Sequence, residues 1–105
     1  MSTLHTVNKS PFASQSLLSS LRHSKEGDAV LMIEDAVYGA AAGTQLNEII
    51  KELGEGAAGV KLYVLEADLQ ARGIDHSRLM KNVSTVDYTG FVKLATEYDT
   101  TQAWL

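Results

Sequence analysis

The stretch Ala29-Val30-Leu31-Met32-Ile33 decides the fold, because it is an unbroken apolar run followed at once by Glu34 and Asp35. A continuous apolar run is typical of a strand that is buried on both faces, as in the interior of a parallel sheet. Asp35 is well placed to cap a following helix. A buried strand that leads directly into a helix is the pattern of an α/β domain.

Working outward from this stretch, strands and helices alternate along the chain. Strand patterns occupy residues 4–8, 60–65 and 83–86, and helical patterns occupy residues 14–24, 36–53 and 66–73. A last helix is expected after the capping residue Asp87, with an apolar face made of Tyr88, Phe91, Val92 and Ala95. Residues 100–105 form a β-prone tail. The order predicts a three-layer α/β/α domain with a mostly parallel sheet of four to five strands.

Composition narrows the class of protein. A chain of 105 residues has room for one core, so we expect a single domain over residues 1–105. The net charge is −4 and no basic run occurs, which argues against direct binding of nucleic acid. The apolar stretches are too short for a membrane span, and the N-terminus lacks the pattern of a signal peptide, so we expect a cytoplasmic protein.

The chain contains no cysteine. It therefore forms no disulfide, holds no metal through thiolates and performs no thiol chemistry of its own. The three histidines, His5, His23 and His76, are dispersed without a metal-ligand spacing. His5 lies inside a predicted strand, where a hydrogen-bonded structural role is favoured. We predict no catalytic residue, no metal site and no cofactor.

Acidic residues follow the predicted strands at Glu34-Asp35, at Glu66 and Asp68, and at Asp87. Because ligands of open α/β sheets bind at the carboxyl ends of strands, this set could hold Mg²⁺ or act in acid–base chemistry. We favour the alternative that Asp35 and Asp87 cap helices while the glutamates are solvated. The turn after the first strand lacks the glycines that phosphate binding requires.

The chain ends on two large apolar residues, Trp104 and Leu105. Chain ends are usually polar and frayed, so the tryptophan either folds back onto the domain or packs against another chain. Tyr38, Trp104 and Leu105 are the predicted interface residues.

Several segments together resemble the DsrH/TusB family. They are Leu4-His5-Thr6-Val7-Asn8-Lys9-Ser10-Pro11-Phe12, then residues 26–31 with Glu34-Asp35, residues 61–65 with Asp68-Leu69 and Ala71-Arg72-Gly73, residues 86–88 with Gly90-Phe91-Val92, and Gln102-Ala103-Trp104. No single segment is specific, but their joint order covers essentially the whole chain. The sequence of these segments is closer to the DsrH side, found in sulfur-oxidising bacteria, than to the TusB side, which serves tRNA 2-thiouridine synthesis.

The resemblance implies a flavodoxin-like fold and a hexamer with subunits of the DsrE/TusD and DsrF/TusC types. Such a complex relays persulfide sulfur between small carriers, including one of the DsrC/TusE type, and its principal cysteine belongs to the DsrE/TusD-type subunit. Some DsrH members also carry a cysteine on the first helix, and Ser20 is its expected counterpart here. Since a serine hydroxyl cannot form a persulfide, this chain would not carry sulfur.

Three hypotheses follow for the function. The leading one is a non-catalytic subunit of a sulfur-relay complex in dissimilatory sulfur oxidation, with a TusB-type role in tRNA thiolation as the alternative. The second is a stand-alone flavodoxin-like nucleotide-binding domain that uses the acidic strand ends. The third is a homo-oligomeric structural domain with no role in sulfur transfer.

Overall fold

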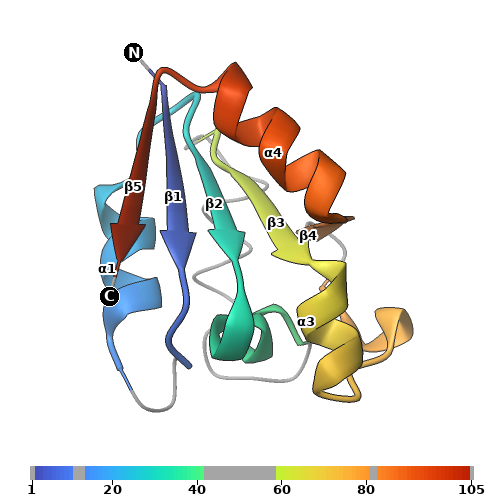
Figure 1. Cartoon of the computed structure of the whole chain (residues 1–105). Coiled ribbons are helices and arrows are strands. Elements are labelled where there is room, and N and C mark those ends of the chain that lie inside the picture. Colours follow the sequence, from blue (N-terminus) through green and yellow to red (C-terminus); the bar gives the residue numbers. More distant parts are fainter. Residues whose placement is uncertain (1, 11–13, 42–58, 81–82, 105) are drawn as a thin grey trace.

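The computed structural model describes residues 2–10, 14–41, 59–80 and 83–104 (Figure 1). The elements, in chain order, are β1 (Thr3–Val7), α1 (Ser16–His23), β2 (Ala29–Met32), the 3-10 helix η1 (Glu34–Ala40), β3 (Lys61–Leu65), α3 (Glu66–Ala71), the 3-10 helix η2 (His76–Arg78), β4 (Val83–Val86), α4 (Tyr88–Glu97) and β5 (Thr100–Trp104). None of the helices in this part of the chain has the length and apolar character needed to cross a membrane.

The five strands form one parallel sheet in the order β4-β3-β2-β1-β5. β2 is the central strand and is buried over its whole length, as its unbroken apolar run predicted. The β-prone tail becomes β5 and pairs with β1 in the register Thr3↔Thr100 to Val7↔Trp104. The predicted parallel α/β sheet is therefore confirmed, with five strands.

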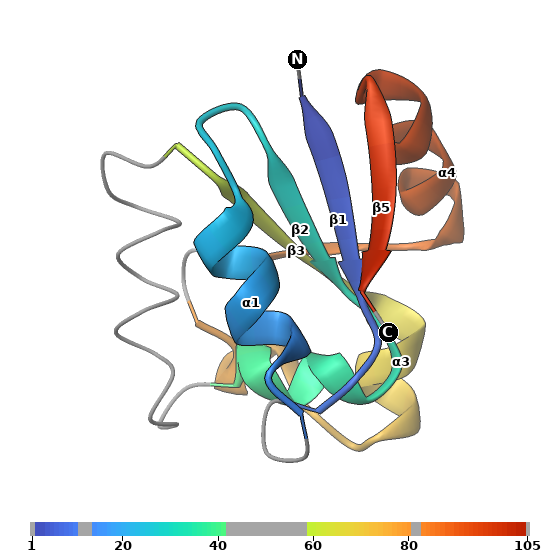
Figure 2. The same ribbon diagram turned by 90° about the vertical axis from the view of Figure 1, so that its left-hand side faces the viewer.

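The strand order determines where the helices lie. Strands β1 to β4 succeed one another across the sheet, and the chain then crosses back over all of them to place β5 beside β1. Because parallel crossovers are right-handed, connections made in opposite directions cover opposite faces. α1 accordingly lies on one face and α4 on the other (Figure 2).

Each face of the sheet has its own apolar core. On the α1 side, Leu17 and Leu21 pack with Val30 and Met32 of the central strand. On the opposite side, Leu94 of α4 packs with Leu4, Ala29 and Leu31, and partly buried aromatic residues surround this smaller cluster. The three-layer arrangement is thus built on alternation, since neighbouring residues of one strand point to opposite faces.

Of the apolar face predicted for the last helix, Phe91 packs against the core, but Tyr88, Val92 and Ala95 are exposed. Tyr88 is 63% exposed and Val92 is 65% exposed, whereas Leu94 is buried and Phe91 packs against its cluster. Two stripes of α4 have helical spacing, one through Tyr88 and Val92 and one through Phe91, Leu94 and Tyr98. The second stripe faces the sheet.

The predicted cap at Asp35 was also wrong. Residues 34–40 form a 3-10 helix whose N-cap is Ile33, without a side-chain capping bond. Glu34 has a φ of 49°, and its N–H donates to Asp68 Oδ2 at 2.7 Å. This left-handed turn directs Asp35 toward Arg72 instead of the helix end. The helix predicted over residues 36–53 lies from residue 42 onward outside the described residues.

Candidate functional site

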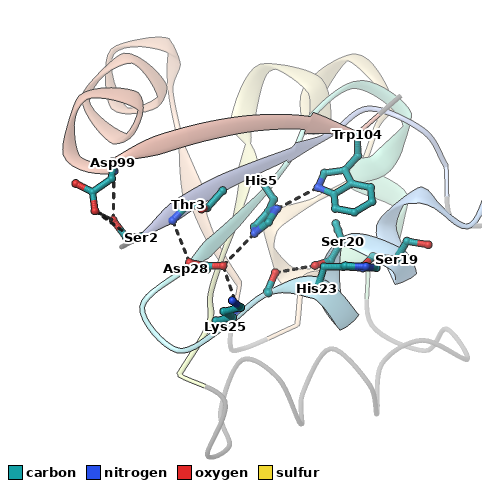
Figure 3. Close-up of polar contacts among 11 residues, drawn as sticks. Ser2, Thr3, His5, Ser19, Ser20, His23, Lys25, Asp28, Asp99 and Trp104 are labelled. Atoms are coloured by element: carbon teal, nitrogen blue, oxygen red, sulfur yellow. Dashed lines mark hydrogen bonds and ion pairs between the residues drawn. The ribbon is translucent and has the colours of Figure 1, made fainter.

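A cavity of about 380 Å³ opens between the end of α1 and the strands β1 and β5 (Figure 3). Its lining residues are Thr3, His5, His23, Lys25, Asp28, Gln102 and Trp104. The strand residues among them alternate, because side chains two positions apart share a face of the sheet. The cavity therefore lies on the α1 side of the sheet, at the edge that β5 forms.

His5 connects the two sides of the cavity through its ring nitrogens. Trp104 Nε1 donates to His5 Nδ1 at 3.0 Å, and His5 Nε2 lies 3.1 Å from Asp28 Oδ2. An indole nitrogen can only donate, so Nδ1 must be the acceptor and the ring proton resides on Nε2. The network thus assigns a neutral His5 in one tautomer. His5 is 4% exposed and both of its ring nitrogens are paired, which confirms its predicted structural role.

Asp28 is buried, and both of its carboxylate oxygens accept hydrogen bonds. Oδ1 accepts from Thr3 N at 2.9 Å, and Oδ2 accepts from Lys25 N at 3.0 Å as well as from His5. Burial raises the pKa of Asp28, but these hydrogen bonds outweigh it and bring the pKa below the ordinary value of 3.8. The ionised carboxylate ties the start of β1 to the loop between α1 and β2.

The Asp28–His5 pair has the arrangement of the acid and base in a hydrolytic triad, but it lacks the nucleophile. In a triad, the free imidazole nitrogen accepts a proton from a hydroxyl group. Here that nitrogen is occupied by the indole N–H of Trp104, which is no nucleophile. The pair therefore holds the C-terminal strand in place and, as arranged, performs no proton transfer.

The mouth of the cavity carries His23 and Lys25. His23 Nδ1 lies 2.8 Å from Ser19 O, and its ring centroid is 5.4 Å from that of Trp104. The Lys25 side chain is exposed, and its ammonium forms no ion pair within the described residues. The mouth thus presents a positive charge beside an aromatic surface.

At the carboxyl ends of β2 and β3, the carboxylates are engaged in structural contacts. Arg72 Nε and Nη2 each lie 2.9 Å from Asp35 Oδ1, and Arg72 Nη1 lies 3.6 Å from Asp68 Oδ1. Asp68 also receives the Glu34 N–H. Arg72 thus bridges the two carboxylates and fastens η1 to α3.

The ends of β3 and β4 border an open crevice of about 310 Å³ lined by Glu66, Ala67, Gln70, Asp87 and Tyr88. Asp87 Oδ1 accepts from Gly90 N at 2.7 Å, which confirms the predicted cap of α4. The Glu66 side chain is 40% exposed, and its Oε1 lies 3.7 Å from His76 Nε2. Within the described ranges, no group of three or more such side chains could hold a metal ion.

The other predicted site residues occupy different surroundings. The Ser20 side chain is completely buried, and its hydroxyl donates to Leu17 O at 2.7 Å. Tyr38 is 37% exposed on η1. Trp104 is partly buried and folds back onto the domain, while Leu105 lies outside the described residues. Interface roles for Tyr38, Trp104 and Leu105 stay predictions.

Sequence reasoning did not single out Asp28 as a site residue. A usable signal was present, because an acidic residue directly before a fully apolar strand must lie at the rim of the core. Pairing of the first two strands places Leu4 beside Ala29, and hence Asp28 next to Thr3 and within reach of His5. A histidine in one strand and a carboxylate at the start of its neighbour were the two halves of the network.

The fold and the site together define a small parallel α/β protein. Within the described residues, the polar network of the site has a structural role. Two solved structures share the fold. The crystal structure of the ychN protein from Escherichia coli superposes with a TM-score of 0.76 at 21% identity and covers 98% of this chain and 99% of its own. A protein of unknown function from Methanobacterium thermoautotrophicum superposes with a TM-score of 0.71 at 18% identity, over 94% of this chain and 95% of its own.

Sequence comparison identifies the family. The family model described as "DsrH like protein" matches residues 9–101. Proteins named TusB are 34% identical in Escherichia coli O81 (strain ED1a) and 40% identical in Pectobacterium parmentieri, in each case over 96% of this chain and 99% of the relative. The chain belongs to the DsrH/TusB family. The expected closeness to the DsrH side is not supported, since these relatives are named TusB.

Proposed function

We propose that this chain is a non-catalytic, cytoplasmic subunit of a TusBCD-type sulfurtransferase complex that serves tRNA 2-thiouridine synthesis. Its partners would be subunits of the TusC/DsrF and TusD/DsrE types, and the complex would deliver sulfur to a carrier of the TusE/DsrC type. The observation that carries the proposal is the match of 34% to 40% identity with TusB proteins over nearly the whole of both chains.

The chemistry of persulfide transfer supports a non-catalytic role. A thiolate attacks the outer sulfur of a persulfide, so that R–S–S⁻ and R′–S⁻ become R–S⁻ and R′–S–S⁻. Both reacting groups must be cysteine thiols or equivalent thiols, and this chain has none. Ser20 is buried and bonded to the backbone of its own helix. The transferred sulfur would therefore pass between partner chains while this subunit supplies packing surface.

The relatives' names favour tRNA thiolation over dissimilatory sulfur oxidation, which our sequence reasoning had put first. The acidic strand ends give the nucleotide-binding hypothesis no support, because Asp35, Asp68 and Asp87 each have a structural partner.

Complementation tests the proposal. The chain is expressed, with its own two sister subunits, in Escherichia coli cells that lack the corresponding subunits, and 2-thiouridine in tRNA is measured by mass spectrometry. We expect the modification to return when all three chains are present and to be absent when this chain alone is omitted. A stable hetero-oligomer of the three chains should be recovered from the same cells.

Thiolation that is unaffected by omitting this chain would contradict the proposal and favour a structural domain with no role in sulfur transfer. If the three chains assemble but 2-thiouridine is not restored, the result would favour the sulfur-oxidation alternative. Ser20→Ala is the matched variant, and it should support the same level of 2-thiouridine because no sulfur chemistry is assigned to that hydroxyl.

A further inference from the structure

The strand β5 forms one edge of the sheet and has β1 as its neighbour. Its residues Thr100–Trp104 include no charged residue and no proline, and its first four residues are exposed. Natural proteins usually protect such an edge with lysine, proline, a bulge or a covering segment, because its free N–H and C=O groups pair readily with another strand. Within the described residues, β5 carries none of these protective features.

The direction of the backbone groups can be assigned along β5. Thr100 N donates to Ser2 O at 3.2 Å, so the peptide groups of Thr100 face β1. Because these groups alternate along a strand, those of Gln102 face β1 as well, and those of Thr101 and Ala103 face the free edge. Two residues thus present their N–H and C=O groups outward.

The cavity described above lies beside this edge. Gln102 and Trp104 belong to its lining, and Lys25 stands at its mouth without an ion pair within the described residues. A strand added to β5 would direct alternate side chains toward the α1 face, over the cavity. A carboxylate on such a side chain would meet the Lys25 ammonium, while its methylene groups would contact the indole ring.

We propose that the β5 edge is a docking site for an extended segment of a partner subunit, and that an acidic side chain of this segment occupies the cavity beside Lys25. The inference rests on the proposed function, since the partner is one of the sister subunits. Backbone pairing would supply much of the attraction, and charge complementarity at Lys25 would set the register of the added strand.

Hydrogen exchange in the assembled complex tests the edge directly. The amides of Thr101 and Ala103 should exchange at least about tenfold more slowly in the complex than in the isolated chain, because pairing protects them. The amides of Thr100 and Gln102, already bonded to β1, serve as internal references. Thr101→Pro should weaken assembly, measured by sedimentation velocity, since proline removes an outward donor, while Thr101→Val should not.

Charge substitutions at Lys25 test whether an acidic side chain of the partner occupies the cavity. Lys25→Glu should weaken assembly at least about fivefold, because two carboxylates would then face each other, and Lys25→Arg should not. Lys61→Glu is the control, since Lys61 is also exposed but lies outside the cavity lining. Each variant is first shown by circular dichroism to be folded.

The outcomes separate the two proposals. If no hetero-oligomer forms, the proposed function and this inference both fail. If the hetero-oligomer forms but Thr101 and Ala103 exchange as fast as before, only the docking site is wrong. Protection of these amides in the isolated chain at high concentration would show that a second copy occupies the edge, which would also overturn the inference.

Discussion

Asp28→Asn tests whether the residues that line the cavity are held in place by hydrogen bonds in the assigned directions. If the amide oxygen accepts from Thr3 N, the NH₂ group faces two donors, Lys25 N and His5 Nε2. Moving the His5 proton to Nδ1 then relieves one conflict, but Nδ1–H would face the N–H of Trp104. If the amide is turned so that its oxygen accepts from Lys25 N and His5 Nε2, the NH₂ group faces the N–H of Thr3 instead. No arrangement of protons satisfies all of these groups.

The variant therefore leaves two donors without an acceptor in a largely buried site. Each such loss costs about 1–3 kcal/mol, so the free energy of unfolding should fall by about 2–6 kcal/mol. This is a large part of the stability of a small domain, which is about 5–15 kcal/mol. Urea unfolding at pH 7 measures the loss by circular dichroism and by the fluorescence of Trp104, the sole tryptophan.

Acid adds a second test of the same carboxylate. The pKa of Asp28 in the folded protein lies below its ordinary value of 3.8, so its stabilising effect is complete above that value and is lost as the pH falls through the lower one. The stability gap between the wild type and Asp28→Asn should therefore narrow below about pH 4.

Asp75→Asn is the control for both measurements. Asp75 likewise accepts a backbone hydrogen bond, from Ser77 N, but it is exposed, so little change in stability is expected. If Asp28→Asn lowers the free energy of unfolding by less than about 1 kcal/mol, the loss is below the range expected for buried unpaired groups. That result would refute the assigned hydrogen-bond network. A gap that stays constant on acidification would refute the role of the charge.

Three further predictions concern single groups. Trp104→Phe keeps an aromatic ring but removes the donor to His5, so urea unfolding should show a loss of about 1–2 kcal/mol, and an unchanged midpoint would contradict the assigned bond. Asp87→Ala removes the cap of α4 and should cost about 1 kcal/mol, whereas Asp87→Ser should retain most of the stability; equal losses would argue against capping. In Ser20→Cys the new thiol should react with a maleimide no faster than the protein unfolds, because the Ser20 side chain is completely buried, and immediate labelling would show the position to be accessible.

Sequence patterns predicted those features that depend on neighbouring residues. The unbroken run from Ala29 to Met32 identified the central strand, and Asp87 was recognised as a cap because its partner is only three residues away. The same local reasoning failed at Asp35, where a left-handed Glu34 and a distant Arg72 decide the geometry. It failed again in α4, where two stripes have helical spacing and only packing against the sheet selects the one through Leu94.

The cavity could not be derived from the sequence, because its parts come from both ends of the chain. His5 and Trp104 are separated by 99 positions, and they meet only because β5 returns to lie beside β1. Either of the two predicted arrangements of Trp104 was compatible with the pattern of the tail. The polar residues that matter most here are those whose partners are set by strand order, which periodicity does not reveal.

The position of β5 also has a consequence for how the chain folds during synthesis. β1 is made first and its neighbour β5 last, so their pairing closes a loop of nearly the whole chain. Such distant contacts are slow to form, because the entropy of loop closure must be overcome before they stabilise anything. While the chain is still being translated, β1 is left as an open edge beside β2. Its apolar residues are then exposed to other nascent chains, and completion of the sheet is a late event that a chaperone or a waiting partner could assist.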